Sequence, residues 1–219
     1  MIRATGVVKS FKLGSVSIDA LRGVDLSVDN GEMVAITGVS GSGKSTLLNL
    51  VGGMDRPDSG SIEVDGENIA LYSNARLTAF RATKIGFIFQ NFNLIPVLSV
   101  YDNIVVPMKL KGQRYEKAKV LELLERVGLT PYAKHRPDEL SGGQRQRVAI
   151  ARSLIHDPPY VLADEITANL DTTTAASIIA LLKELNRDYG VTIVFASHDQ
   201  RILDGIERKI ALEDGVLIQ

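Results

Sequence analysis

Short apolar runs that alternate with longer helical patterns dominate the hydrophobicity pattern of the chain. Residues 24–28 alternate apolar and polar side chains, which predicts a half-buried strand. Shorter β-rich runs predict further strands at residues 33–37, 61–64, 85–89, 160–163, 192–196 and 209–212. Because strands separated by helical segments are typical of a parallel sheet, we predict an α/β fold with a mainly parallel sheet.

The middle of the chain, residues 115–155, has a helical pattern with little strand signal. A first helix is predicted to bury one face and expose the opposite one: the apolar face comprises Ala118, Leu121, Leu124 and Val127, and the polar face Glu116, Lys119, Glu122 and Arg126. Gly128 and Pro131 end it, and a second helix is predicted from Ser141 to Ile155. This predicts an all-helical insert of about 60 residues within the α/β core.

Composition narrows the class of protein but gives no function. The 219 residues include 25 Lys and Arg against 26 Asp and Glu, a net charge of −1 that excludes a polybasic nucleic-acid binder. The absence of cysteine excludes disulfides, thiolate metal sites and a cysteine nucleophile. No apolar run approaches the ~18 residues of a membrane span, and residues 1–9 lack a signal-peptide pattern. We therefore expect a soluble, intracellular protein.

A glycine-rich loop carries the first chemical signal. Residues 38–45 read Gly-Val-Ser-Gly-Ser-Gly-Lys-Ser, which fits the P-loop pattern, between an apolar strand and a helical segment. Glycines let backbone N–H groups approach phosphate oxygens, and the following helix presents its positive end to the same charge. The residues predicted to bind the nucleotide here are Gly38, Ser40, Gly41, Ser42, Gly43, Lys44, Ser45 and Thr46.

Three of these side chains have predicted roles. Lys44 would reach the β- and γ-phosphates, the Ser45 hydroxyl would ligate Mg²⁺, and Thr46 would lie near the α-phosphate. The alternative is a Gly/Ser-rich turn that binds no ligand. The Lys-Ser pair and the flanking elements favour the nucleotide site.

An acidic pair follows the predicted strand at residues 160–163. Asp164 is predicted to hold Mg²⁺ through water, and Glu165 to orient or deprotonate the attacking water. By themselves these residues would indicate a solvated strand end. Together with the P-loop, they favour a nucleotide-hydrolysing site.

A third motif makes the assignment specific. Leu140-Ser141-Gly142-Gly143-Gln144 resembles the signature motif of the ABC-transporter ATPases, where hydroxyl and backbone N–H groups meet phosphate at a helix N-terminus. An N-cap and turn would explain the helix start but not the whole set of motifs. Three further residues resemble that family: Phe11 the aromatic that stacks on adenine, Gln90 the Q-loop glutamine that senses Mg²⁺ and γ-phosphate, and His198 the switch histidine.

Residues 168–171 resemble the D-loop of the family, which meets the opposite subunit. Ile166 departs from the family, which usually has proline there, and the loss of a φ-locked residue is expected to loosen the backbone that aims Glu165. His135 and His156 match no motif and are expected at the surface. Residues 53–60 and 85–96 resemble the lipoprotein-releasing, macrolide-export and FtsE-like branch.

The resemblance implies a P-loop NTPase fold: an ABC-type ATPase core with a mainly parallel sheet, an N-terminal antiparallel β-subdomain and an inserted α-helical subdomain. It implies one domain over residues 1–219, with the ATP-binding core at about 1–92 and 157–219 and the helical subdomain at about 93–156. The catalytic residues would be Glu165, His198, Lys44 and Gln90, and Mg²⁺ would be held by Ser45, Gln90 and Asp164.

The function implied by the resemblance is that of an ATP-binding and ATP-hydrolysing subunit, using ATP and Mg²⁺, that powers a separate transmembrane permease of the export or mechanotransmission type. It would close head to tail as a homodimer, or as a heterodimer with a second ATPase subunit, each copy capping the other's ATP with Ser141 to Gln144. It would lie peripherally at the cytoplasmic face of the membrane and bind no nucleic acid.

Other functions remain as alternatives. One is a non-transport ABC ATPase that acts on ribosomes or DNA, although such proteins usually carry paired ATPase domains or a long coiled coil. Another is an ATP-dependent clamp with weak turnover, an alternative that Ile166 keeps open. A small-molecule kinase or GTPase would explain the P-loop but not residues 140–144.

Overall fold

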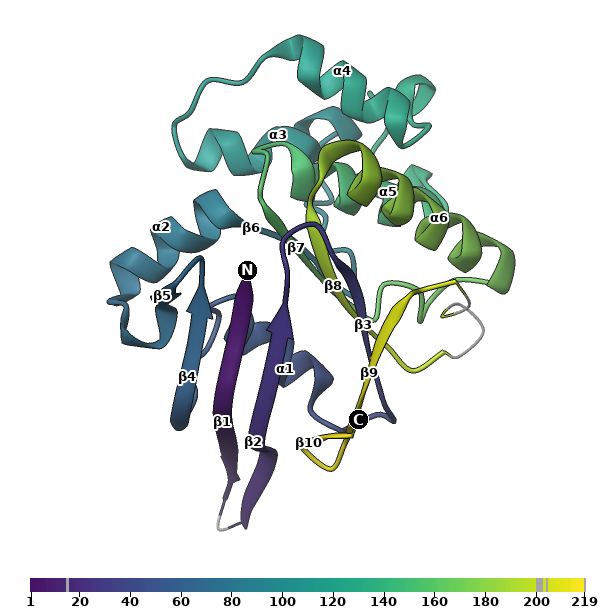
Figure 1. The fold of residues 1–219 in the computed structure, drawn as a ribbon. Helices are drawn as coiled ribbons and strands as arrows, with labels where there is room; N and C mark the ends of the chain where they lie inside the picture. The colour runs from purple at the N-terminus through teal and green to yellow at the C-terminus, as the bar shows by residue number, and fades with distance from the viewer. Residues whose placement is uncertain (15, 200–202, 204, 219) are drawn as a thin grey trace.

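Two β-sheets and a helical layer make up the fold (Figure 1). The structure is a computed structural model that describes residues 1–14, 16–199, 203 and 205–218. Its strands are β1 (Ile2–Leu13), β2 (Val16–Val28), β3 (Met33–Thr37), β4 (Ser59–Val64), β5 (Glu67–Asn68), β6 (Ile85–Ile88), β7 (Tyr160–Asp164), β8 (Thr192–Ser197), β9 (Arg208–Glu213) and β10 (Val216–Ile218). Its α-helices are α1 (Lys44–Val51), α2 (Asn74–Lys84), α3 (Val100–Leu110), α4 (Lys117–Arg126), α5 (Gly142–Leu154) and α6 (Thr172–Tyr189). Short 3₁₀ turns are η1 (Ile69–Leu71), η2 (Thr130–Tyr132) and η3 (Pro137–Glu139).

The larger sheet is mainly parallel, as predicted. Its order is β10-β9-β3-β8-β7-β6, and only the β10–β9 pair among these described pairings is antiparallel. The smaller sheet, β2-β1-β4-β5, is antiparallel throughout, which confirms the predicted N-terminal antiparallel part. The fold is therefore the α/β class inferred from the sequence.

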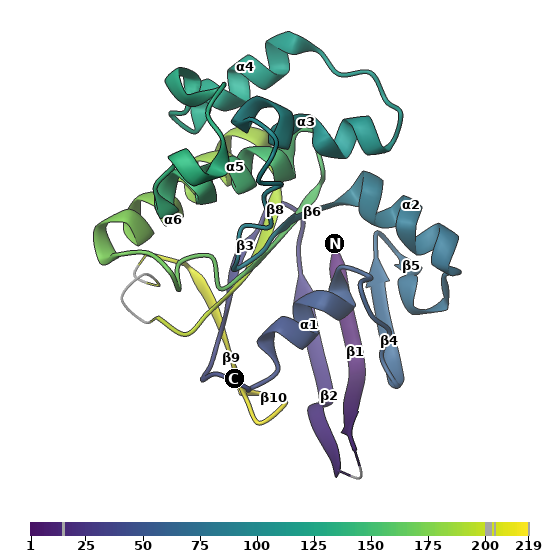
Figure 2. The ribbon, with the colours of Figure 1, turned by 180° about the vertical axis from the view of Figure 1, so that it is seen from behind.

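The two faces of the parallel sheet are covered differently. Helix α1 contacts strands of both sheets, and one buried cluster joins its leucines to apolar residues of β1, β2, β3 and β4. A second cluster joins the opposite face of the sheet to α3, α4, α5 and α6 (Figures 1 and 2). This arrangement leaves α1 and the loop before it between the two sheets.

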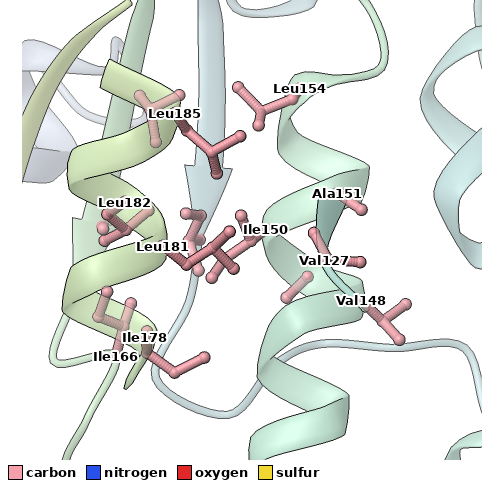
Figure 3. Packing of buried hydrophobic residues seen from close by; sticks show 14 of the residues in the cluster. Val127, Val148, Ile150, Ala151, Leu154, Ile166, Ile178, Leu181, Leu182 and Leu185 are labelled. Atoms are coloured by element: carbon pink, nitrogen blue, oxygen red, sulfur yellow. The ribbon is translucent and has the colours of Figure 1, made fainter. Parts of the chain in front are cut away.

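Helices α5 and α6 pack against each other through aliphatic side chains (Figure 3). Ile166, which lies in the loop between β7 and α6, joins this cluster and is 2% exposed. A buried isoleucine contributes on the order of 2 kcal/mol of transfer free energy. Packing of Ile166 therefore anchors the segment that follows Glu165, where the sequence led us to expect a looser backbone.

The predicted apolar face of α4 is partly wrong. Ala118 is exposed and Leu121 is 45% exposed, whereas Val120 and Leu123 are buried with Leu124. Steps of three residues drift by about 60° around a helix, so the predicted series turns away from the core at its start. The buried stripe instead follows a spacing of three and four residues, which keeps to one face.

His135 and His156 are not the surface residues expected from the sequence. Both are partly buried, and each has a buried Nδ1 atom without a hydrogen-bond partner in the described part of the chain. His156 Nε2 lies 3.2 Å from the carbonyl oxygen of Ile85. Burial, together with the nearby charge of Lys111, lowers the pKa of His156 to about 4, so this imidazole is neutral at pH 7.

No helix within the described residues is long and apolar enough to span a bilayer.

Candidate nucleotide site

The loop between β3 and α1 is shaped by glycines that a side chain would obstruct. Gly43 has a φ of +107°, and a Cβ atom there would lie 2.4 Å from the carbonyl oxygen of Ala20. Gly38 has a φ of +151°, and its Cβ would lie 2.2 Å from the carbonyl oxygen of Leu212. The loop therefore passes tightly between β2 and β9 and delivers its N–H groups to the N-terminal end of α1.

Lys44 is the first residue of α1 and is 5% exposed, and its side chain turns back towards this loop. Its Nζ donates hydrogen bonds of 2.9 Å to the carbonyl oxygens of Gly38 and Val39. The same Nζ lies 3.3 Å from Glu165 Oε1. A buried ammonium held in this way offers a fixed positive charge to an anion entering the loop.

The acid at the end of β7 is tied to the start of α1. The Ser45 hydroxyl donates a 2.8 Å hydrogen bond to Asp164 Oδ1. Burial raises the pKa of Asp164, as does the charge of Glu165, while the Ser45 hydrogen bond and Lys44 oppose the rise. The two oxygens thus form a partly desolvated pair at the edge of the loop.

Glu165 is held between two basic side chains. Its backbone has a φ of +47°, an uncommon conformation for a glutamate, and its N–H donates to the carbonyl oxygen of Ala196 at 3.1 Å. Besides the contact with Lys44, Glu165 Oε2 lies 2.8 Å from His198 Nδ1. The parallel pairing of β7 with β8 brings Asp164 beside Ala196, which places the carboxylates near His198. Such a carboxylate can accept a proton or orient a water molecule.

These groups border a cavity of about 290 Å³. Its predicted lining residues are Phe11, Ser40, Gly41, Gly43, Lys44, Ser45, Thr46, Gln90, Glu165 and His198. Gly38, Ser42 and Asp164 are not among the lining residues, although Gly38 accepts a hydrogen bond from Lys44 and Asp164 accepts one from Ser45. Residues from β1, the P-loop, the end of β6 and the ends of β7 and β8 thus meet at one site, although they are far apart in the sequence.

Two lining residues leave accessible faces. Phe11 is 44% exposed, and Lys9 Nζ lies 5.3 Å from its ring centroid. Gln90, which follows β6, is also exposed. An aromatic ring and an amide that line the same cavity suit a planar base and a phosphate group, respectively.

The predicted signature residues do not line this cavity. Ser141, Gly142, Gly143 and Gln144 lie at the N-terminal end of α5 and form a capping box: Gln144 N donates to Ser141 Oγ at 3.2 Å, and Ser141 N donates to Gln144 Oε1 at 2.8 Å. Asp171, in the predicted D-loop, caps α6 by accepting a 3.0 Å bond from Thr174 N.

Sequence reasoning missed one lining residue, Ala20 of β2. It contributes through its backbone, whose carbonyl oxygen faces Gly43, and an alanine carries no chemical signal that would have marked it.

A second, more apolar cavity of about 440 Å³ is bordered by Phe89 and Asn93, which lie on either side of Gln90 in the sequence. It is lined by side chains from α2, β6, α3 and α5, among them Phe87, Phe89, Leu110, Lys111 and Arg152. The Phe87 and Phe89 rings stack with centroids 5.2 Å apart.

The donor set near the P-loop suits Mg²⁺. Ser45, Gln90 and Asp164 offer a hydroxyl, an amide and a carboxylate oxygen, the hard ligands that Mg²⁺ prefers, and one carboxylate leaves places for water and phosphate oxygens. No cluster of three or more histidine, cysteine or acidic ligands occurs among residues that the structure describes.

Comparison with known proteins agrees with this geometry. A family described as "ABC transporter" matches residues 21–168. The lipoprotein-releasing system ATP-binding protein LolD of Legionella pneumophila is 43% identical over 211 residues, covering 95% of this chain and 93% of that protein. The macrolide export ATP-binding/permease protein MacB of Rhodopirellula baltica is 40% identical over 223 residues, but this chain spans just 33% of its length.

The solved structures give the same result. One described as "Dimeric structure of a post-hydrolysis state of the ATP-binding cassette MJ0796 bound to ADP and Pi" matches with a TM-score of 0.91 and 41% identity, covering 100% of this chain and 97% of that one.

Proposed function

Since this chain belongs to the ABC transporter family as an ATP-binding, ATP-hydrolysing domain, we propose that it is the subunit that powers a separate membrane permease of the export or mechanotransmission type. One observation carries the catalytic part of the proposal: Glu165 lies between Lys44 and His198, beside the Ser45–Asp164 pair. This chain matches 93% of LolD, whose name describes the ATP-binding protein of a lipoprotein-releasing system, and this match supports the role of the ATP-binding part of such a system.

In the proposed site, each residue has one task. Phe11 stacks on adenine, and Ser40, Gly41, Gly43 and Thr46 line the path of the phosphates, while Gly38 and Ser42 complete the loop that carries them. Lys44 exchanges its bonds to the loop carbonyls for the β- and γ-phosphates, which places its charge where negative charge develops. When bound, Mg²⁺ neutralises phosphate charge, and Ser45, Gln90 and Asp164 are the residues that would hold it.

Glu165 orients the attacking water and takes its proton. His198 fixes one oxygen of this carboxylate, and Lys44 holds the other until phosphate arrives. The Ile166 side chain anchors the same segment in the α5–α6 cluster, which favours a stable aim and real turnover over a clamp that only binds.

Two copies complete two sites. Because Ser141 to Gln144 lie outside the cavity of their own chain, we propose that they cap ATP in a second copy of this chain or in a second ATPase subunit. The dimeric MJ0796 structures support this assembly. The core would comprise residues 1–92 and 157–219, and the helical subdomain residues 93–156 would move relative to it.

We place the permease contact at the 440 Å³ cavity between α2, β6, α3 and α5. Its stacked Phe87 and Phe89 rings and the 83% exposed Leu110 form an apolar surface beside Gln90, suited to a helix of the permease. The protein would therefore act at the cytoplasmic face of a membrane.

The proposal is tested by phosphate release from the purified chain. We expect ATP hydrolysis that needs Mg²⁺, and a fall of about 10²-fold or more in kcat for Glu165→Gln. Glu184→Gln is the matched control, because Glu184 is exposed on α6 and away from the cavity. Hydrolysis that Glu165→Gln leaves unchanged would contradict the catalytic assignment.

A further inference from the structure

The segment that follows Gln90 contains two consecutive residues in the left-handed region. Phe92 has a φ of +60° and Asn93 a φ of +48°. Phe92 N donates to Phe89 O at 3.1 Å, and Asn93 N donates to Asn91 O at 2.6 Å, which makes a tight turn. Neither residue is glycine, so each carries the steric cost of this conformation. Contacts from elsewhere in the fold must therefore hold the turn.

Arg152, near the end of α5, supplies such contacts. Its Nη2 donates to Phe92 O at 2.6 Å, and its Nη1 donates to Asn93 O at 2.5 Å. The planar fork of one guanidinium thus holds the carbonyls of both left-handed residues. Burial lowers the pKa of Arg152, and within the described residues no carboxylate pairs with it. Arg152 therefore makes two directed, charge-assisted hydrogen bonds to the turn, unlike a surface arginine that is solvated by water.

A second arginine of the same helix touches the same turn. Arg145 lies seven residues before Arg152, about two helical turns, and so projects from the same face of α5. Its guanidinium carbon lies 5.4 Å from the centroid of the Phe92 ring. Helix α5 therefore contacts the turn at two places: Arg152 binds the backbone carbonyls of the turn, and Arg145 lies over the Phe92 ring.

Gln90 lies just before this turn in the chain. Its exposed side chain lines the nucleotide cavity, and no side-chain hydrogen bond fixes it among the residues that are described. One residue, Asn91, separates it from Phe92 and Asn93, whose carbonyls Arg152 holds. We propose that Arg152 is a positioning residue, which fixes the left-handed turn at Phe92–Asn93 and thereby aims Gln90 into the nucleotide cavity. This inference rests on the proposed role of Gln90 in ATP hydrolysis.

The first test is the kinetics of Arg152→Met and Arg152→Lys. We expect kcat to fall about tenfold in Arg152→Met and less in Arg152→Lys, because an ammonium reaches one carbonyl where the fork reaches two. KM for ATP should change by less than about twofold, because the P-loop and Phe11 carry binding. Arg126→Met is the matched control, since Arg126 pairs with Asp188 on the surface.

The second test separates positioning from a general loss of packing. In Arg152→Met/Asn93→Gly, glycine adopts the positive φ without steric cost, so kcat should recover at least in part. The chain has no tryptophan, so Asn91→Trp provides a single reporter beside Gln90. Acrylamide should quench this tryptophan more strongly when Arg152 is replaced by methionine or lysine, while the thermal midpoint checks that each variant is folded.

Three results would overturn the inference: an unchanged kcat in folded Arg152→Met, a loss of kcat that Asn93→Gly does not reverse, or unchanged quenching in the reporter variants. If Arg152→Met does not fold, Arg152→Lys with the reporter gives the same decision. Failure of the proposed function has a different signature, because the parent chain would then release no phosphate at all.

Discussion

The Ser45 hydroxyl donates a 2.8 Å hydrogen bond to Asp164 Oδ1 and so joins the first turn of α1 to the end of β7. Of the three residues proposed to hold Mg²⁺, Ser45 and Asp164 are the two that lie furthest apart in the sequence, and this bond links them. Burial raises the pKa of the Asp164 carboxyl, and this hydrogen bond opposes the rise.

Replacing Asp164 with asparagine keeps the shape of this pair and removes its charge. We expect the Mg²⁺ concentration needed for half-maximal ATP hydrolysis to rise about tenfold or more, because a neutral amide attracts the ion less than a carboxylate does. A Mg²⁺ titration of phosphate release measures it. Asp138→Asn, an exposed acid in η3, is the control, and an equal Mg²⁺ requirement in both variants would remove Asp164 from the metal site.

Gly43→Ala tests the close approach of the P-loop to β2. A Cβ atom at this position meets the Ala20 carbonyl oxygen at 2.4 Å, at a φ of +107°. We expect a loss of about 3 kcal/mol or more in the free energy of unfolding and the loss of ATP-induced thermal stabilisation.

Gly190→Ala is the matched control for Gly43→Ala. Gly190 has a φ of +63° at the end of α6, and nothing lies within 4 Å of its added Cβ. The expected cost there is about 1–2 kcal/mol with ATP binding retained. If both variants had the same thermal midpoint and the same increase in that midpoint on adding ATP, the clash with the Ala20 carbonyl would affect neither stability nor ATP binding.

Asp65 gives a pH-dependent prediction remote from the nucleotide. Partial burial raises its pKa, but hydrogen bonds from Lys84 and Tyr160 outweigh this and lower the pKa from 3.8 to about 2. A carboxylate with a lowered folded-state pKa stabilises the protein above the unfolded pKa, and this stabilisation is lost as the pH falls towards 2.

Asp65→Asn should therefore lower the free energy of unfolding at pH 7 by about 1 kcal/mol. This loss is smaller than the pKa shift alone would give, because the side chain of Asp65 is 36% exposed and solvent screens its charge. Urea unfolding at pH 7 and at pH 3 measures the effect, which should shrink at the lower pH. A difference that stays constant between the two pH values would contradict the assignment to Asp65.

Local motifs made much of the fold and the site predictable. Strands β3 and β7 lie within one residue of their expected ranges, because each is a continuous apolar run bounded by a glycine or an acid. The P-loop and the acidic pair were recognisable because each joins a characteristic residue type to a position directly after a predicted strand. The P-loop follows β3 and the acidic pair follows β7, two parallel strands on either side of β8, and their shared end of the sheet brings Lys44, Asp164 and Glu165 together.

Features that depend on tertiary contacts were harder to predict from the sequence. Strand β1 breaks the two-residue alternation with register shifts after Ala4, Val7 and Lys9, so no simple pattern marks it. His156 is partly buried where it contacts Ile85 of β6. The hydrogen bond from Arg152 to the carbonyl of Phe92 joins residues that are 60 positions apart. The burial of Ile166 was equally hidden, because an isoleucine in a loop gives no sign of the cluster it enters.

The position of Ser141 to Gln144 outside their own cavity has a consequence for genetics. In the proposed head-to-tail dimer, each site takes its P-loop from one copy and its cap from the other. A copy damaged at Lys44 still offers a sound cap, and a copy damaged at Ser141 still offers a sound P-loop. When the two damaged copies pair, one site inherits both defects and the other inherits neither. Two alleles that are each inactive would therefore complement when expressed together, whereas two alleles damaged in the same half would not.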